Sequence, residues 1–152
     1  MTKRSKSRSV ARLGAVQALY QLDMEKPSMA RLLAEFHAHR LNGAMSGDID
    51  DAIFADAEVE FFDDIVRGVD ARREEIDAII DSKLGAQWKM SRIDKTMLQI
   101  LRAGTYEMIA RADVPTASVI TEYVDVAHAF FDEKDAKFVN GLLDAVAREQ
   151  RS

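Results

Sequence analysis

The spacing of apolar residues constrains this chain more than any other feature. They recur every three or four positions along almost the whole sequence, which is the period of an amphipathic α-helix and differs from the alternation of a half-buried strand. The 152 residues include only two prolines and no alternating runs rich in valine or threonine. The pattern therefore predicts an all-α protein.

The apolar stripes predict about seven helices. Helices are expected over residues 5–24, 28–43, 57–82, 94–112, 115–130 and from about 135 onward. Gly68 should bend or divide the third helix. Trp88 should lie in a short turn that fills the junction between two bundles. Ser28 and Asp94 are expected to act as N-caps. The segment 44–56 holds glycine, serine and four aspartates, so it is expected to be the longest loop.

Two small helical bundles that share a core account for these stripes. We expect one compact domain (1–152), made of an N-terminal helical subdomain (1–83) with a basic arm and a C-terminal helical subdomain (84–152). Three glycines fall inside predicted helices, where each costs about 1 kcal/mol relative to alanine. The usual reason is that another helix crosses closely. We expect such crossings at Gly14, Gly104 and Gly141.

Cysteine is absent, which excludes disulfides, thiolate metal sites and cysteine nucleophiles and is typical of a reducing compartment. The chain contains no apolar run of about 20 residues, the length that a membrane-spanning helix needs. A basic start followed by the apolar stretch 13–22 loosely resembles an export signal, but polar residues interrupt it and no convincing cleavage site follows. We therefore expect a soluble, cytoplasmic protein that does not contact a membrane.

Positive charge is concentrated at the start of the chain. The net charge is −5, yet five cations and no acidic residue precede Asp23. Taking these five from the 21 basic residues leaves 16 against 26 acidic ones, so a leader of charge +5 precedes a body of charge −10. The five cations are Lys3, Arg4, Lys6, Arg8 and Arg12. Such a split is typical of a basic arm that binds a polyanion, and a solvated terminus is the alternative.

Signatures of catalysis and metal binding are scarce. The sequence has no glycine-rich phosphate loop, no nucleophile elbow and no histidine pair with metal-ligand spacing. His37 and His39 are two residues apart, so on a helix they point in nearly opposite directions and cannot share a metal. Asp48, Asp50 and Asp51 lack the glycine and glutamate spacing of a calcium loop. We therefore predict a binding protein that is not an enzyme and needs no metal or cofactor.

A cation, an aromatic ring and an amide lie together in the last predicted helix, at Lys137, Phe138 and Asn140. In RNA recognition these groups contact the phosphate, the base face and the base edge. Taken alone, Phe138 is more typical of a core residue than of a ligand contact. The combination favours an RNA-binding surface.

Four motifs follow one another along nearly the whole chain. The first is the arginine-containing start with AVQALY at 15–20. The second consists of Trp88, RI at 92–93, ILR at 100–102 and YE at 106–107. The third is DVP at 113–115 with Glu122, and the fourth is KFVNG at 137–141 with Leu143. KFVNG is the most specific of them. In order and spacing these motifs resemble those of the NusB family.

The resemblance implies an all-helical fold of two subdomains and a function in transcription antitermination. NusB-like proteins bind the boxA element of nascent ribosomal RNA together with NusE, a small-subunit ribosomal protein. RNA polymerase, in a complex with other Nus factors, then passes terminators. Carried over to this chain, the five cations of the leader would bind phosphates, and Tyr20, Lys137, Phe138 and Asn140 would lie on or near the same RNA face. The resemblance leaves open whether the chain forms a homodimer.

Two departures from the family pattern affect the implied contacts. Serines and Val10 interrupt the cations, which often form an unbroken run in the family, so fewer phosphate contacts are expected. Met97 and Leu98 stand where an acidic and a basic residue usually precede ILR. If that surface binds NusE, these two partner-binding residues make the contact more apolar.

Two alternative functions remain open from the sequence. A NusB-like module also precedes the catalytic domain of some ribosomal RNA cytosine methyltransferases, and a nucleotide-binding catalytic domain would identify that class. A helical protein-binding adaptor would not need RNA at all. Salt-dependent binding to a boxA RNA would distinguish the RNA-binding function from such an adaptor.

Overall fold

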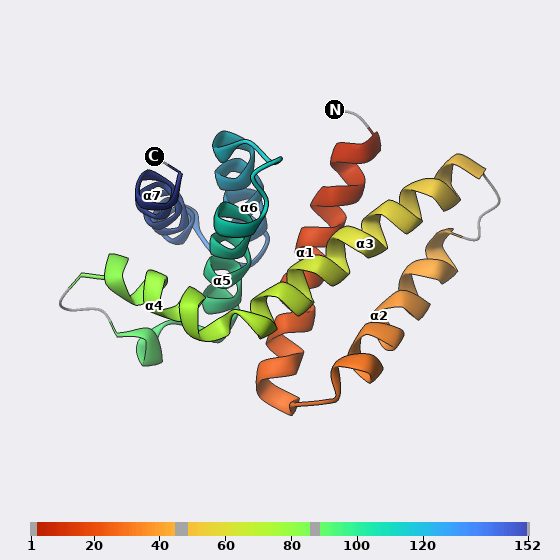
Figure 1. The fold of residues 1–152 in the computed structure, drawn as a ribbon, viewed down its shortest axis with the longest axis horizontal. Helices are drawn as coiled ribbons and strands as arrows, with labels where there is room; N and C mark the ends of the chain where they lie inside the picture. Colours follow the sequence, from red (N-terminus) through yellow and green to blue (C-terminus); the bar gives the residue numbers. More distant parts are fainter. Residues whose placement is uncertain (1–2, 45–48, 86–88, 152) are drawn as a thin grey trace. The chain divides into compact units, whose positions relative to one another are not determined.

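The computed structural model describes the backbone of residues 3–44, 49–85 and 89–151, and the side chains of 7–38, 58–85 and 89–151. This part of the chain consists of seven α-helices and one 3-10 turn and contains no strand, so the all-α prediction is confirmed (Figure 1). The helices are α1 (Lys3–Glu25), α2 (Met29–Ala44), α3 (Ile49–Ala71), α4 (Arg73–Lys83), α5 (Lys95–Ala110), α6 (Thr116–Phe130) and α7 (Glu133–Gln150), and the turn η1 is Met90–Arg92. No helix in the described ranges is long and apolar enough to cross a membrane.

Both predicted N-caps are confirmed. At the start of α2, the backbone N–H of Arg31 donates to Ser28 Oγ at 3.2 Å. At the start of α5, Asp94 Oδ1 accepts from the N–H groups of Thr96 at 2.8 Å and Met97 at 3.2 Å. These bonds satisfy N–H groups that have no partner within the first turn of a helix. The side chain of one residue thus fixes where each helix begins.

Two predicted loop boundaries are wrong. The sequence predicted a loop over 44–56, whereas α3 already begins at Ile49. The aspartates that follow Ile49 lie in the first turns of a helix, where the N-terminal dipole favours negative charge. The segment 131–134 between the last two predicted helices is also shorter as a loop, because Asp132 caps α7 by accepting from the N–H of Asp135 at 3.1 Å.

The chain divides into two compact units, Met1–Arg67 (unit 1) and Gly68–Ser152 (unit 2). The sequence placed the division later, after residue 83. The contacts divide the chain earlier because α4 packs against α5 and α7, and Ile76 and Ile80 on α4 are fully buried. Helix α4 therefore belongs to unit 2.

Gly68 has a packing role. The sequence predicted that it bends or divides a helix, but it lies inside α3 and the helix breaks at Arg72. A Cβ at Gly68 would collide with the ring of Tyr106, so the missing side chain makes room for this aromatic residue. Trp88 lies outside the described residues, and its predicted place at a junction stays a prediction.

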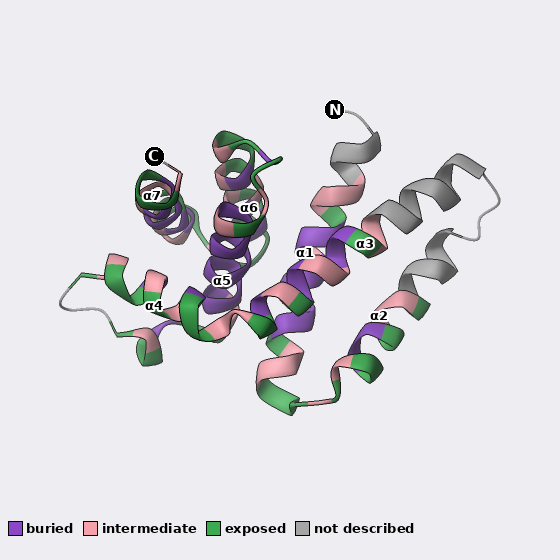
Figure 2. Cartoon of the chain, viewed as in Figure 1, coloured by how far each residue is buried: buried purple, intermediate pink, exposed green. Residues whose placement is uncertain are grey.

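Helix α5 is the central helix of unit 2. Every residue from Met97 to Met108 is buried, and Figure 2 shows α5 as a largely purple helix. Burial on all sides requires neighbours all round, and α4, α6 and α7 all pack against it. At Gly104 a Cβ would lie 2.8 Å from Leu143 Cδ1, so the close helix crossing predicted there is confirmed.

Two buried polar groups of α5 are paired within unit 2. Glu107 is fully buried and accepts a hydrogen bond from the Tyr123 hydroxyl. Arg102 donates from Nε at 2.8 Å and from Nη2 at 2.9 Å to the two carboxylate oxygens of Asp77. Because a buried polar group without a partner is costly, these pairs stabilise the way α4 and α6 pack on α5.

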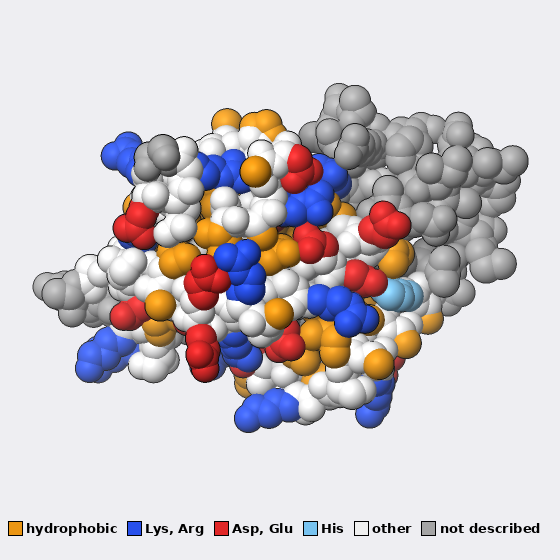
Figure 3. All heavy atoms as spheres, viewed as in Figure 1, with side chains coloured by type: hydrophobic (Ala, Val, Ile, Leu, Met, Phe, Trp, Pro, Cys, Tyr) orange, Lys and Arg blue, Asp and Glu red, His pale blue; other side chains and the backbone are white. Residues whose placement is uncertain are grey.

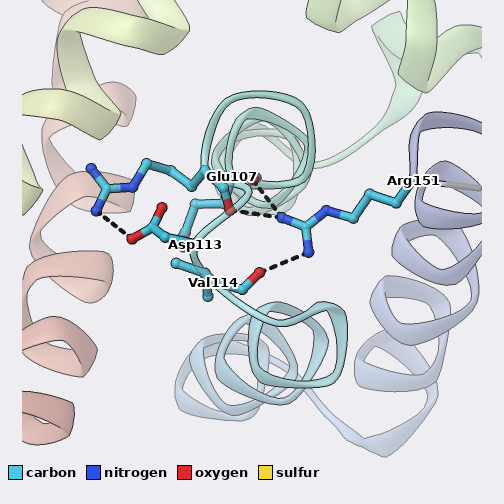
Figure 4. A network of polar contacts seen from close by, with 5 residues as sticks. Glu107, Asp113, Val114 and Arg151 are labelled. Carbon is cyan, nitrogen blue, oxygen red and sulfur yellow. Dashed lines mark hydrogen bonds and ion pairs between the residues drawn. The ribbon is translucent and has the colours of Figure 1, made fainter.

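Arg151 joins the end of α5 to the start of α6. Its guanidinium donates to the carbonyls of Glu107 at 3.1 Å and Val114 at 2.7 Å (Figure 4). It donates to the carbonyl of Met108 at 2.9 Å as well. It also donates to the carbonyl of Arg111 at 2.8 Å. The last carbonyls of a helix have few partners inside it, and Arg151 binds two of those of α5, Glu107 and Met108.

Unit 1 is built from α1, α2 and most of α3. The rings of Phe36 on α2 and Phe62 on α3 stack with centroids 5.4 Å apart. His37 packs edge-on against Phe62, and its Nε2 atom lies 2.6 Å from Asp63 Oδ1. His37 thus takes part in ring packing and in a hydrogen bond between α2 and α3.

Candidate nucleic-acid interface

The basic leader belongs to α1, which is helical from Lys3 onward and so begins earlier than the sequence predicted. The side chains of Lys3, Arg4 and Lys6 lie outside the described residues. Arg8 and Arg12 are four positions apart, so they lie on the same face of the helix. Their contacts with phosphate stay predictions.

Arg8 and Arg12 lie over one aromatic ring. The Cζ atom of Arg8 is 4.6 Å and that of Arg12 is 4.9 Å from the ring centroid of Phe61 on α3. At these distances the electron-rich face of the ring attracts the guanidinium charge. Arg8 is half-buried, whereas Arg12 is only 3% exposed. Arg8 therefore has the larger surface for a phosphate, and Arg12 contributes mainly to the packing of α1 on α3.

Tyr20 is the exposed aromatic residue of α1, with 40% of its surface accessible. Met24, one turn further along the helix, is exposed as well. An exposed tyrosine ring offers a flat face on which a nucleobase can stack. The position of Tyr20 fits the stacking role that the family resemblance implied, and that role stays a prediction.

Lys137, Asn140 and Gly141 are exposed together on α7. The close helix crossing predicted at Gly141 is wrong, because a Cβ there would meet nothing within 4 Å. The surface beside the lysine and the amide is therefore open. Phe138 is half-buried, so it is neither a fully enclosed core residue nor a fully exposed ring.

Phe138 lines a cavity of about 370 Å³ in unit 2. Its apolar lining comes from Ile93, Met97, Phe131 and Phe138, and its charged lining from Arg92, Asp94, Lys134, Asp135 and Lys137. Asp94 is already engaged in capping α5. The cavity therefore combines aromatic and aliphatic side chains with three cations and two carboxylates, a net charge of +1. Its apolar lining suits the flat face of a base, and its cations suit a neighbouring negative charge.

Part of this cavity was not predicted from the sequence. Phe131 and Lys134 fall between the last two predicted helices, whereas in the structure both line the cavity with Lys137 and Phe138. A signal was present, because two aromatic residues and two lysines occur within eight positions, from 131 to 138. These residues line one cavity because α7 begins directly after its cap at Asp132, and the sequence alone does not fix that start.

Met97 and Leu98 are each only 4% exposed. Met97 reaches the cavity lining, and Leu98 is part of the buried stretch of α5. In this conformation the two side chains leave little surface for a protein partner. An apolar NusE contact at these residues would therefore need neighbouring residues to supply most of its area.

Charge sign alone does not mark a site on the surface. On the face in Figure 3, Lys and Arg side chains are interspersed with Asp and Glu side chains. Arg72 lowers the pKa of Glu75 through a hydrogen bond of 2.7 Å, and Lys83 lowers the pKa of Glu149 through one of 2.6 Å. These are surface ion pairs, which do not indicate catalysis. In the described ranges there is no cluster of three or more potential metal ligands.

Comparison with known proteins identifies the family. The NusB family model matches residues 9–148, which is most of the chain. The chain belongs to the NusB family. The predicted family is thus confirmed.

Two NusB relatives match almost the whole chain. The transcription antitermination protein NusB of Novosphingobium aromaticivorans is 60% identical over 146 residues, which cover 96% of this chain and 96% of the relative. That of Sphingopyxis alaskensis is 60% identical over 151 residues and 99% of both chains.

Solved NusB structures have the same fold. T. maritima NusB matches with a TM-score of 0.75 and 26% identity over 95% of this chain and 93% of its own. A chain in the crystal structure of the antitermination factors NusB and NusE in complex with dsRNA matches with a TM-score of 0.77 and 26% identity. This match covers 95% of this chain and 98% of the other.

Proposed function

We propose that this protein is an RNA-binding transcription antitermination factor that acts with ribosomal protein NusE. It binds the boxA element of nascent ribosomal RNA transcripts in the cytoplasm and helps RNA polymerase, together with other Nus factors, to read through terminators. The relatives that are 60% identical are transcription antitermination proteins, and a structural neighbour is found with NusE and RNA. The role is that of a binding protein and uses no cofactor.

The cavity beside Lys137 and Phe138 is the observation that carries the RNA-binding part of the proposal. Its apolar lining can receive the face of one unstacked base, and its cations can bind the adjoining phosphates. The exposed amide of Asn140 can hydrogen-bond a base edge, and the open surface at Gly141 lets an RNA backbone approach. Recognition of a single strand therefore needs no rearrangement of α7.

Unit 1 contributes charge and a second ring. The leader of charge +5 counters the repulsion between RNA and a body of charge −10. If it neutralises about four phosphates, the affinity for single-stranded RNA falls with salt at a log–log slope of roughly −3. Tyr20 adds a stacking face. We propose that residues of each unit contact the same RNA strand.

A binding assay with a boxA RNA and a scrambled RNA of equal length tests the proposal, with and without NusE. We expect preference for boxA, tighter binding with NusE, and a loss of affinity in Lys137→Ala combined with Asn140→Ala. Lys95→Ala is the control, because Lys95 is exposed in the same unit but does not line the cavity. Equal binding of both RNAs, or no RNA binding, would contradict the proposal and favour a protein-binding adaptor.

A further inference from the structure

We infer that Phe61 is a positioning residue for RNA binding: its ring holds the side chains of Arg8 and Arg12 in place on the basic face of α1. The inference rests on the proposed RNA-binding function. It adds a residue from α3, which lies in none of the sequence motifs and has no polar group of its own.

The geometry brings two like charges to one ring. Both guanidinium carbons lie within 5 Å of the Phe61 centroid, and the two arginines are one helical turn apart on α1. Like charges at this spacing repel each other, whereas the face of an aromatic ring attracts each of them. The attraction to the ring therefore offsets part of the repulsion between the two side chains.

Phe61 cannot itself stack on RNA, because it is only 3% exposed. It acts through the arginines. A guanidinium that already lies against a ring loses less side-chain freedom when its edge binds a phosphate, so the bound state is reached at a smaller entropic cost. Loss of the ring should weaken binding without changing the number of phosphates that are neutralised.

The adjacent residue offers a matched control. Phe62 is 4% exposed, nearly the same as Phe61, but it stacks on Phe36 and packs against His37. Phe61→Leu and Phe62→Leu each replace a buried ring with a smaller apolar side chain in the same helix. Only the first removes a ring that lies under arginines.

The experiment measures the affinity for boxA RNA over a range of salt concentrations, with thermal unfolding in parallel. Phe61→Leu should weaken binding by about three- to tenfold at every salt concentration and leave the log–log salt slope unchanged. Phe61→Tyr, which keeps the ring, should bind like the wild type. Phe62→Leu should lose stability but keep its RNA affinity to within about twofold.

Arg8→Lys provides a second variant that does not disturb the core. Lysine keeps the charge, and therefore the salt slope, but loses the planar group that stacks on the ring. We expect weaker binding with an unchanged slope, while Arg31→Lys on the exposed surface of α2 binds as the wild type does.

Three results would overturn the inference: wild-type affinity in Phe61→Leu, equal weakening in Phe62→Leu, or wild-type affinity in Arg8→Lys. If Phe61→Leu does not fold, the Arg8→Lys result decides. The absence of RNA binding by the wild-type protein would instead reject the proposed function, so the two failures are distinguishable.

Discussion

Arginine side chains have different roles in the two units. In unit 2, Arg102 donates to both carboxylate oxygens of Asp77, and Arg151 donates to backbone carbonyls at the end of α5. In unit 1, Arg8 and Arg12 lie over the ring of Phe61. Hydrogen bonds use the edge of a guanidinium, whereas stacking uses its face. Arg102 and Arg151 therefore stabilise the fold of unit 2, whereas the half-buried Arg8 is proposed to bind a phosphate.

The largest effect that tests this comparison should come from Arg102→Ala. The Arg102 side chain is 7% exposed and that of Asp77 is 29% exposed, so the substitution leaves a half-buried carboxylate without its bidentate partner. We expect the free energy of unfolding in urea to fall by about 2 to 4 kcal/mol. In Arg148→Ala, an exposed pair with Asp144 is lost, and the change should stay within about 0.5 kcal/mol. Similar losses in both variants would contradict the structural role assigned to the buried Arg102–Asp77 pair.

Tyr123→Phe should have the next largest effect. It removes the hydroxyl that donates to the fully buried Glu107 and adds no new steric contact. Thermal or urea unfolding should show a loss of about 1 to 3 kcal/mol, with RNA affinity unchanged. Tyr20→Phe removes an exposed hydroxyl and should leave stability unchanged. A loss of RNA affinity in Tyr123→Phe, with the fold intact, would contradict a purely structural role for the Tyr123–Glu107 pair.

Arg8→Ala and Arg12→Ala should separate the two stacked arginines. Arg12 is 3% exposed, so its loss should lower the free energy of unfolding by about 1 to 2 kcal/mol through lost packing. Arg8→Ala should reduce the magnitude of the log–log salt slope for RNA binding by about 0.7, because one phosphate contact is lost. If Arg12→Ala changed the salt slope and Arg8→Ala changed only the stability, the phosphate contact would lie at Arg12.

The smallest effect concerns a surface ion pair. Lys83 lowers the pKa of Glu149, so the stability from this pair is present above the ordinary carboxyl pKa of 4.5 and is lost as the pH falls through the lowered value. Glu149→Gln should therefore be slightly less stable than the wild type at pH 7, and the difference should vanish in acid. Unfolding curves at pH 7 and pH 3 measure it. A difference that persists in acid would show that charge is not its cause.

The helices could be predicted from the sequence because their signals are local. Periodic apolar residues placed α1, α2, α5, α6 and α7, and the capping residues Ser28 and Asp94 fixed two of their starts. The segment 44–56 was misread because aspartate is common both in loops and in the first turn of a helix. Local composition could not decide between these two structures.

The site was only partly predictable, because its contacts join distant parts of the chain. The exposure of Lys137 and Asn140 follows from the period of α7. The ring beneath Arg8 and Arg12 comes from α3, and no local pattern links Phe61 to α1. At Gly141 the local pattern predicted a contact that does not exist. A glycine inside a helix indicated a close helix crossing, but Gly141 faces open space.

The central claim is that residues of both units bind one RNA strand. Titration of isotope-labelled protein with a boxA RNA, followed by NMR chemical shifts, tests it most directly. We predict that signals from both units shift together and saturate at one RNA per protein. The signals are those of Arg8 and Tyr20 in unit 1 and of Lys137, Asn140 and Gly141 in unit 2. Shifts confined to one unit, or separate saturation in the two, would contradict it.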